Sequence, residues 1–241
     1  MKKKIFLLIV AALLVLIGSG IIYFKHRITP PSAAALKSLA AAEKRPSGYY
    51  FPGESDKPLI IVYPGALIDV RSYSVWASAL AREGYPVYLV EMPLEFSFFA
   101  SSKADQALAE IKPQTYIIGG HSAGGAAASH FAAQKIKKHD QRLHGVFFMA
   151  SYAIGGKTLS SSTIPALSLT GSLDRDIPDK SVREKKTAFP KNTEFQTITG
   201  GVHLGFASTT KGSPGAELTN AEQNTLVAQE MLDWLVQSKI Q

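Results

Sequence analysis

Residues 117–125 read IIGGHSAGG and contain the pattern Gly-x-Ser-x-Gly, with the serine at position 122. The pattern follows a short apolar run and precedes an alanine-rich run, so it lies where a predicted strand meets a predicted helix. Such a sharp turn needs small residues around the serine, because the chain on its two sides approaches closely. Glycines here would also suit an ordinary turn that packs a helix on a sheet. The strand before and the helix after favour Ser122 as a nucleophile.

Around this motif, short apolar runs rich in β-branched and aromatic residues alternate with longer amphipathic runs, which is typical of repeated β-α units on a largely parallel sheet. Five runs are nearly continuous in apolar residues, as expected for strands covered on both faces: Leu59–Tyr63, Val87–Met92, Thr115–Gly119, Gly145–Ala150 and Ala166–Thr170. A sixth run, Glu194–Ile198, alternates and is predicted at an edge of the sheet. Helices are predicted between them over Ser72–Glu83, Lys103–Ile111, Ala123–Lys138 and Ser181–Ala188. A last helix is predicted from a capping box formed by Thr219 and Glu222.

A serine hydroxyl needs a base, and where serine sits on a strand-to-helix turn the partners follow in the order serine, acid, histidine. Four histidines follow Ser122, of which three lie in the next helix or in the polar connection after it: His130, His139 and His144. The fourth, His203, lies in the glycine-rich stretch 200–205 after the last predicted strand. The order and the position predict His203 as the general base.

The acid is sought in TGSLDRDIP at residues 170–178, which follows a predicted buried strand. Asp174 and Asp176 both fall on this loop, at the same edge of the sheet as Ser122. Asp174 is preferred because it comes first after the strand and turn, whereas Asp176 could cap the turn before Pro178. Its role would be to fix the tautomer of His203.

The oxyanion formed when serine attacks a carbonyl needs preorganised donors. One is the backbone amide of Ala123, which follows the nucleophile at the start of a helix. The second is expected in the loop after Leu59–Tyr63, where Gly65 gives the backbone room to turn the amide of Ala66 inward. Pro64-Gly65 would otherwise be an ordinary turn.

Together these residues resemble the α/β-hydrolase superfamily, and within it the bacterial group often named α/β-hydrolase fold-5. The resemblance runs from Leu59 to the C-terminus and rests on YPGALID at 63–69 with Arg71 and Tyr73, EMPLEF at 91–96, IIGGHSAGG at 117–125, GSLD at 171–174 and GGVHLGF at 200–206. It implies the α/β-hydrolase fold, a mainly parallel sheet flanked by helices, with the same triad and the same two amides. One departure is Glu95, where the family usually carries an amide side chain.

Composition narrows the function classes further. The chain has 241 residues, no cysteine and a net charge of +7. Without cysteine there is no disulfide, no thiolate metal site and no cysteine nucleophile. Much of the positive charge flanks an N-terminal apolar run, so a nucleic-acid partner is not expected. No His-Glu-x-x-His motif occurs, and we expect neither a metal nor another cofactor.

The N-terminus predicts a membrane anchor. Residues 5–24 carry no charge and match the roughly 20 residues that cross a bilayer. A cleaved signal peptide would have a shorter apolar region, so an uncleaved transmembrane helix is favoured. Lys2, Lys3 and Lys4 outweigh the charges after the run and favour the N-terminus inside, with the catalytic domain outside the cell membrane. The sequence thus divides into an anchor at 1–28, a stalk or linker at 29–47 and a catalytic domain at 48–241.

Residues 151–165 are too few for a helical cap, so a minimal cap and an open site are expected. Phe96, Phe98 and Phe99 either line an acyl pocket or belong to the core. The preferred function is hydrolysis of carboxylic esters, either short-chain or membrane-proximal and amphiphilic, through an acyl-enzyme. The same triad could instead transfer the acyl group to another acceptor, or the chain could be a retired hydrolase that serves as a binding module. The oligomeric state is left open.

Overall fold

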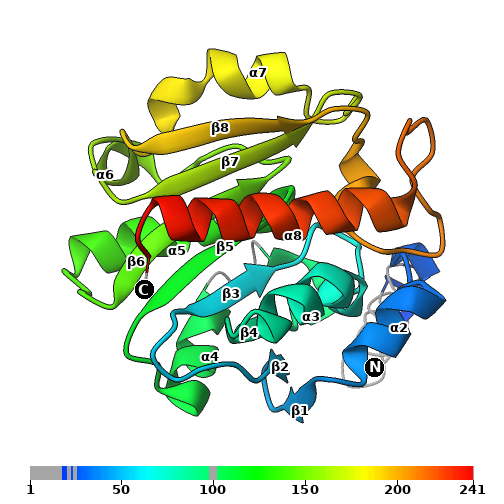
Figure 1. Ribbon diagram of the computed structural model, residues 1–241, viewed down its shortest axis with the longest axis horizontal. Helices are drawn as coiled ribbons and strands as arrows, with labels where there is room; N and C mark the ends of the chain where they lie inside the picture. Colours follow the sequence, from blue (N-terminus) through cyan, green and yellow to red (C-terminus); the bar gives the residue numbers. More distant parts are fainter. Residues whose placement is uncertain (1–17, 21–22, 24–25, 98–101, 241) are drawn as a thin grey trace, which may run out of the picture.

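The computed structural model describes residues 18–20, 23, 26–97 and 102–240. Their centre is an eight-stranded sheet in the order β1-β2-β4-β3-β5-β6-β7-β8 (Figure 1). The strands are β1 Glu43–Arg45, β2 Gly48–Phe51, β3 Leu59–Tyr63, β4 Val87–Val90, β5 Tyr116–His121, β6 Leu143–Met149, β7 Ala166–Gly171 and β8 Thr193–Ile198. β1 and β2 pair antiparallel, as do β2 and β4, and the pairs from β4 to β8 are parallel. The fold is therefore the predicted α/β-hydrolase fold, with a mainly parallel sheet.

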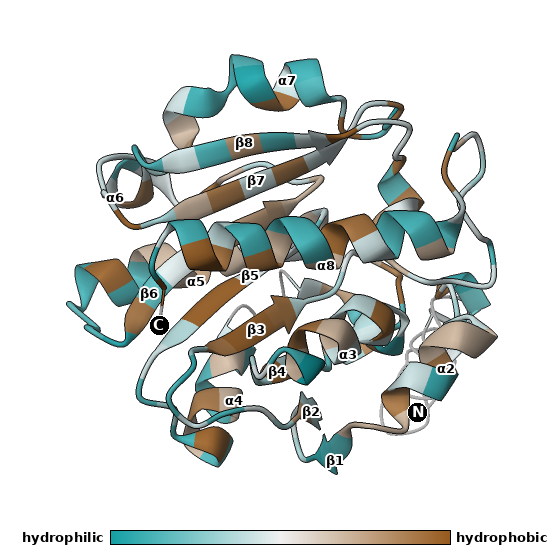
Figure 2. Cartoon of the chain, in the orientation of Figure 1, coloured by the Kyte–Doolittle hydropathy of each residue, from teal (hydrophilic) through white to brown (hydrophobic). Residues whose placement is uncertain are grey.

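Helices cover both faces of this sheet and separate two apolar cores. One face carries α3 (Ser74–Arg82) and α8 (Asn220–Gln237), whose side chains join the first core. The other carries α4 (Ala104–Ile111), α5 (Ala123–Lys137), α6 (Gly156–Ser160) and α7 (Asp179–Glu184). Figure 2 shows apolar residues along β3, β5 and β7, and polar and apolar residues alternating along α8. Burial on both faces explains the near-continuous apolar runs of the central strands.

The predicted elements agree with the structure to within a few residues, and β8 lies at an edge of the sheet as expected. The capping box at Thr219 and Glu222 is present at the start of α8. The predicted helix at 72–83 begins instead as the 3-10 turn Val70–Tyr73, and that at 181–188 is α7 followed by the 3-10 turn Lys186–Ala188. Residues 151–165 hold only α6, in line with a minimal cap. The short strands β1 and β2 were not predicted.

Residues 29–47, which the sequence suggested as a stalk, pack on the domain. Thr29 bridges Ile68, and Pro31 bridges Thr209. Helix α2 (Ala33–Leu39) then lies against α3, with Ala35 fully buried. Because β1 begins at Glu43, the packed part of the chain starts well before residue 48.

Most of the predicted transmembrane segment, residues 5–24, lies outside the described residues. Among the residues that are described, no helix combines the length and apolar character needed to cross a membrane.

Candidate active site

Ser122 stands on the turn between β5 and α5, with backbone angles φ 53° and ψ −125°. A positive φ is unfavourable for serine and persists because its surroundings hold the turn. The Ser122 N–H donates to Met149 O at 2.9 Å, and Ser151 Oγ donates to Ser122 O at 2.7 Å. The turn therefore presents a half-buried serine at the carboxyl edge of the sheet, at the N-terminus of α5.

Two glycines of the motif make this turn possible. A Cβ on Gly120 would lie 2.3 Å from Tyr63 O, and one on Gly124 would lie 2.3 Å from Pro64 O. Both contacts are far inside van der Waals distance, so a larger residue at either position would push β5 or α5 away from the end of β3. The small residues expected from the sequence are thus required by backbone packing.

His203 begins the 3-10 turn His203–Phe206 after β8, and its Nδ1 lies 2.8 Å from Asp174 Oδ2. Asp174 is buried, and its Oδ1 accepts the backbone N–H groups of Asp176 and Ile177 at 2.9 and 2.8 Å. These donors satisfy the carboxylate oxygen that does not face the imidazole. The structure thus brings His203 to Asp174, while Asp176 is exposed.

The histidine loop is held by two side chains of α8 that sequence reasoning missed. The side-chain amide of Gln223 is fully buried: its Oε1 accepts the Val202 N–H at 3.0 Å and its Nε2 donates to Val202 O at 2.9 Å. Asn224 Nδ2 donates to Gly205 O at 3.1 Å. Helical spacing could have indicated that Gln223 is buried, because it precedes the buried Val227 by one turn and therefore lies on the same face of α8.

The sequence predicts that the backbone amides of Ala66 and Ala123 serve as the oxyanion donors, and Ala66 lines the same cavity as Ser122. Ala123 is the first residue of α5, where backbone N–H groups lack helical partners. Across the described residues, neither amide has a hydrogen-bond partner. The loop of Ala66 is fixed on both sides, since Gly65 N–H donates to Tyr73 Oη at 2.8 Å and Leu67 N–H donates to Glu95 O at 3.0 Å.

Ser122, His203 and Ala66 line one cavity of about 620 Å³. Its other walls come from residues 26–30, from the loop of Leu67 and Ile68, and from Asp176, Leu204 and Lys211. A second cavity of about 400 Å³ shares Asp176, His203 and Leu204 with the first. A hydroxyl, an imidazole held by a buried carboxylate and an unpaired amide therefore line one cavity, and no hydrogen bond joins Ser122 Oγ to His203 within the described residues.

The profile described as "Alpha/beta hydrolase family" matches residues 59–225, more than half of the sequence. The chain belongs to the alpha/beta hydrolase family. None of the curated protein sequences matches it.

Solved structures similar to this alpha/beta hydrolase share its fold at low identity. MGS-MChE2, an alpha/beta hydrolase enzyme from the metagenome of lagoon sediments of Mar Chica, Morocco, is 13% identical with a TM-score of 0.61, over 82% of this chain and 99% of that one. The esterase domain of a Rhodothermus marinus protein is 14% identical with a TM-score of 0.57, over 78% and 91%. A membrane phospholipase A described as a bacterial virulence factor is 14% identical with a TM-score of 0.60, over 99% of each chain.

Behind the catalytic edge, this hydrolase contains a buried chain of polar groups. Tyr73 Oη accepts the Gly65 N–H and lies 3.0 Å from His121 Nδ1. Since Gly65 is the donor to Tyr73, the phenol hydrogen is free to be donated to His121 Nδ1. Burial and the neighbouring His203 lower the pKa of His121 well below its usual value. A neutral His121 ring thus lies against His203, with ring centroids 4.6 Å apart, and links the loop of Gly65 and Ala66 to His203 through Tyr73.

Glu95 also contacts the loop that carries Ala66 and Leu67. Its backbone φ is 52°, its carbonyl accepts the Leu67 N–H, and its Oε2 is buried without a hydrogen-bond partner within the described part of the chain. Burial, together with the carboxylates of Asp69 and Glu91, raises the pKa of Glu95 to about 8. This carboxyl is therefore mostly protonated at neutral pH.

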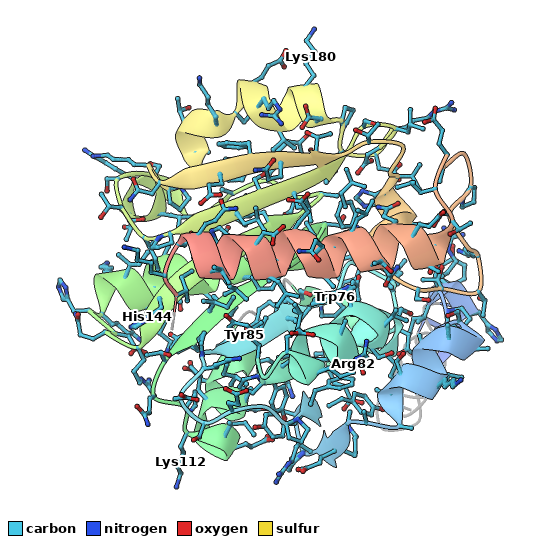
Figure 3. All side chains as sticks on the ribbon, viewed as in Figure 1. Trp76, Arg82, Tyr85, Lys112, His144 and Lys180 are labelled. Carbon is cyan, nitrogen blue, oxygen red and sulfur yellow. The ribbon has the colours of Figure 1, made fainter. Side chains whose placement is uncertain are left out.

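The three other histidines that follow Ser122 in the sequence do not line its cavity. His130 is exposed on α5, 2.9 Å from Gln134, and His139 is exposed after that helix. His144 lies on β6, far from the carboxyl edge (Figure 3). Phe96 is half-buried, while Phe98 and Phe99 lie outside the described residues.

Asp174, Asp176 and His203 each place one possible metal-ligand atom within 4.8 Å of the others. A metal ion there would compete with the hydrogen bond between Asp174 and His203, and two backbone amides already occupy the other oxygen of Asp174. Within this set, Asp174 and His203 are thus already paired with each other.

Proposed function

We propose that the protein is a membrane-anchored serine hydrolase that cleaves carboxylic esters, with Ser122 as nucleophile, His203 as general base and Asp174 as the orienting acid. The observation that carries the proposal is the shared cavity: Ser122 on its strained turn lines it together with His203, whose Nδ1 is held by buried Asp174. Among the proteins of similar fold, an esterase domain and a membrane phospholipase A are named for ester cleavage, which agrees with the proposal.

In the proposed reaction, Ser122 Oγ attacks the ester carbonyl carbon while His203 Nε2 takes the hydroxyl proton. The carbonyl electron pair moves onto oxygen, where the amides of Ala66 and Ala123 donate to it, and the N-terminus of α5 adds a favourable dipole. The carbonyl then re-forms, the alcohol leaves with the proton from His203, and an acyl-serine remains. Water attacks this acyl group by the same route and releases the acid.

Asp174 supports both halves of the reaction. It accepts the Nδ1 hydrogen of His203, so that Nε2 is free to act as a base, and it stabilises the imidazolium that forms. The backbone amides of Asp176 and Ile177 on Asp174 Oδ1 hold the carboxylate in the orientation in which Oδ2 faces His203.

The test is labelling of the purified full chain with a fluorophosphonate, followed by peptide mass spectrometry, alongside an ester-hydrolysis assay. We expect modification of Ser122 alone, and loss of both labelling and hydrolysis in Ser122→Ala. His203→Ala should lose labelling while it remains folded. An unlabelled Ser122 in folded wild type, or hydrolysis that survives Ser122→Ala, would contradict the proposal, and the former would favour a binding module.

The proposed anchor is residues 5–24, with the catalytic domain on the outer side of the cell membrane. The uncharged run and the lysines before it support this arrangement. Because the chain has no cysteine, the exposed Ser55→Cys and the N-terminal Lys2→Cys variants each carry one thiol. On intact cells, a membrane-impermeant maleimide should label Ser55→Cys and spare Lys2→Cys. The reverse result would place the domain inside.

A further inference from the structure

Three cationic side chains surround the mouth of the candidate active site. Arg27 and Lys211 line the cavity that contains Ser122, and Arg175 lines the adjoining cavity that shares His203 with it. All three are exposed, and none forms an ion pair within the ranges that the structure describes. The opposing charge on these walls is the single carboxylate of Asp176, so the mouth carries a net positive charge.

The backbone holds two of these cations in place. Thr29 donates to Leu67 O at 2.7 Å and accepts the Asp69 N–H at 3.1 Å, which fixes the chain two residues after Arg27. Thr210 donates to Pro30 O at 3.0 Å, which fixes the residue before Lys211. Two segments far apart in sequence therefore carry one cation each to the same wall.

The side chains themselves remain available to a ligand. The guanidinium carbon of Arg27 lies 5.9 Å from the ring centroid of Tyr23, a stacking contact that leaves its N–H groups able to bind an anion. Apolar side chains, among them Ile28, Leu67 and Leu204, line the same cavity. The cations would not contribute to binding a neutral ester. An ester with an anionic group near its carbonyl would contact both the cations and the apolar side chains.

We propose that Arg27 and Lys211 form an anion-binding subsite and that the preferred substrates are amphiphilic esters carrying a phosphate or carboxylate near the scissile bond. This inference rests on the proposed hydrolase function and deepens it. Arg27 directly follows the predicted anchor, so an anionic ester at the membrane surface would meet the subsite as it enters.

The test compares matched substrate pairs with the purified full chain. The first pair is monooctanoylglycerol and its 3-phosphate, which places the anion on the alcohol side. The second is 4-nitrophenyl butyrate and mono-4-nitrophenyl glutarate, which places it on the acid side. Both pairs are used as monomers in solution, and the readout is the ratio of kcat/KM for the anionic ester to that for the neutral ester.

We expect the wild type to prefer the anionic member of one pair, and the Arg27→Gln/Lys211→Gln variant to lose about 3- to 10-fold of that preference. About 0.5 M salt should weaken the wild-type preference, because exposed charges are screened. The matched control is Lys180→Gln/Lys191→Gln, which removes the same charge at two exposed lysines that line neither cavity; Lys180 points outward from α7 (Figure 3). The control should keep the wild-type ratio.

Labelling of Ser122 by the fluorophosphonate reports that each variant is folded and reactive. The subsite is refuted if, for both substrate pairs, the ratio is the same in wild type and in Arg27→Gln/Lys211→Gln. The hydrolase function still stands in that case, provided that Ser122 is labelled and the neutral esters are cleaved. A ratio change of equal size in the lysine control would also refute it, by assigning the effect to net charge. Absence of labelling in wild type would refute the hydrolase function itself.

Discussion

The buried carboxyl of Glu95 makes the stability of this hydrolase dependent on pH, and Glu95→Gln should remove that dependence. In the folded protein the pKa of Glu95 is raised from 4.5 to about 8, first by burial and then by Asp69 and Glu91; Arg71 and the Val70 amide oppose the shift. Between about pH 4.5 and 8 the folded state binds a proton that the unfolded state has released. The free energy of unfolding therefore falls as pH rises through this window and levels off above pH 8.

The size of the effect follows from the pKa difference. A rise from 4.5 to about 8 is about 3.5 units, and at about 1.4 kcal/mol per unit the full penalty for the ionised carboxyl is on the order of 5 kcal/mol. Although Oε2 is buried, the residue as a whole is partly exposed and water screens part of this penalty, so we expect on the order of 2 to 5 kcal/mol. Glutamine keeps the shape without the charge. The variant should match wild type near pH 5 and exceed its stability by this amount at pH 9.

Urea unfolding of the full chain at pH 5, 7 and 9 measures the effect. The two tryptophans, Trp76 and Trp234, are both buried and report unfolding by fluorescence. Glu184→Gln, at an exposed position on α7, is the matched control and should follow the wild-type pH profile. The reasoning is refuted if Glu95→Gln and wild type keep the same difference in stability at all three pH values, or if the variant is less stable at pH 9.

Three further variants probe the site. Asp174→Asn should lower kcat for ester hydrolysis by about 10³- to 10⁴-fold, because an amide cannot select the tautomer of His203 that leaves Nε2 free. The circular dichroism spectrum should be unchanged. A loss of kcat below tenfold would argue against the role of this carboxylate. Gly124→Ala should lower the melting temperature by about 10 °C or more, since its Cβ would meet Pro64 O at 2.3 Å, and a wild-type melting curve would contradict the packing argument. Tyr73→Phe removes the hydroxyl that contacts both the Gly65 amide and His121. It should lower the free energy of unfolding in urea by about 1–3 kcal/mol and reduce kcat more than it raises KM. An unchanged kcat would show that Tyr73 does not position the loop of Ala66.

The sequence predicted the covered strands well because their apolar runs are set by burial on both faces. It missed β1, whose residues Glu43–Arg45 are polar, and β2, which begins at a glycine. Both exist as strands because β2 pairs with the open edge of β4 and β1 pairs with β2, and a local pattern does not contain that pairing.

Within the candidate site, local motifs predicted the proposed catalytic residues but not the residues that support them. Ser122 and His203 stand in glycine-rich stretches that mark turns, and the order of serine, acid and histidine pointed to Asp174. The supports were out of reach, because Gln223 and Tyr73 act through contacts between elements distant in sequence. The sequence also did not predict that residues 26–30 line the cavity, because their position depends on β-bridges to Ile68 and Thr209.

The segment that contains Thr29 and Ser32 is hydrogen-bonded to two loops of the candidate site. Its contacts therefore determine how much of the N-terminus can be removed without disturbing that site. Thr29 holds the loop of Ala66 through hydrogen bonds with Leu67 and Asp69, while Ser32 N–H donates to Ser208 O beyond the turn of His203. A soluble version begun at residue 45, the natural choice if 29–47 were a stalk, would lose both fastenings together with α2. Deleting the apolar run but starting no later than residue 26 keeps them, so the activity of the two truncations should differ although both retain Ser122, Asp174 and His203.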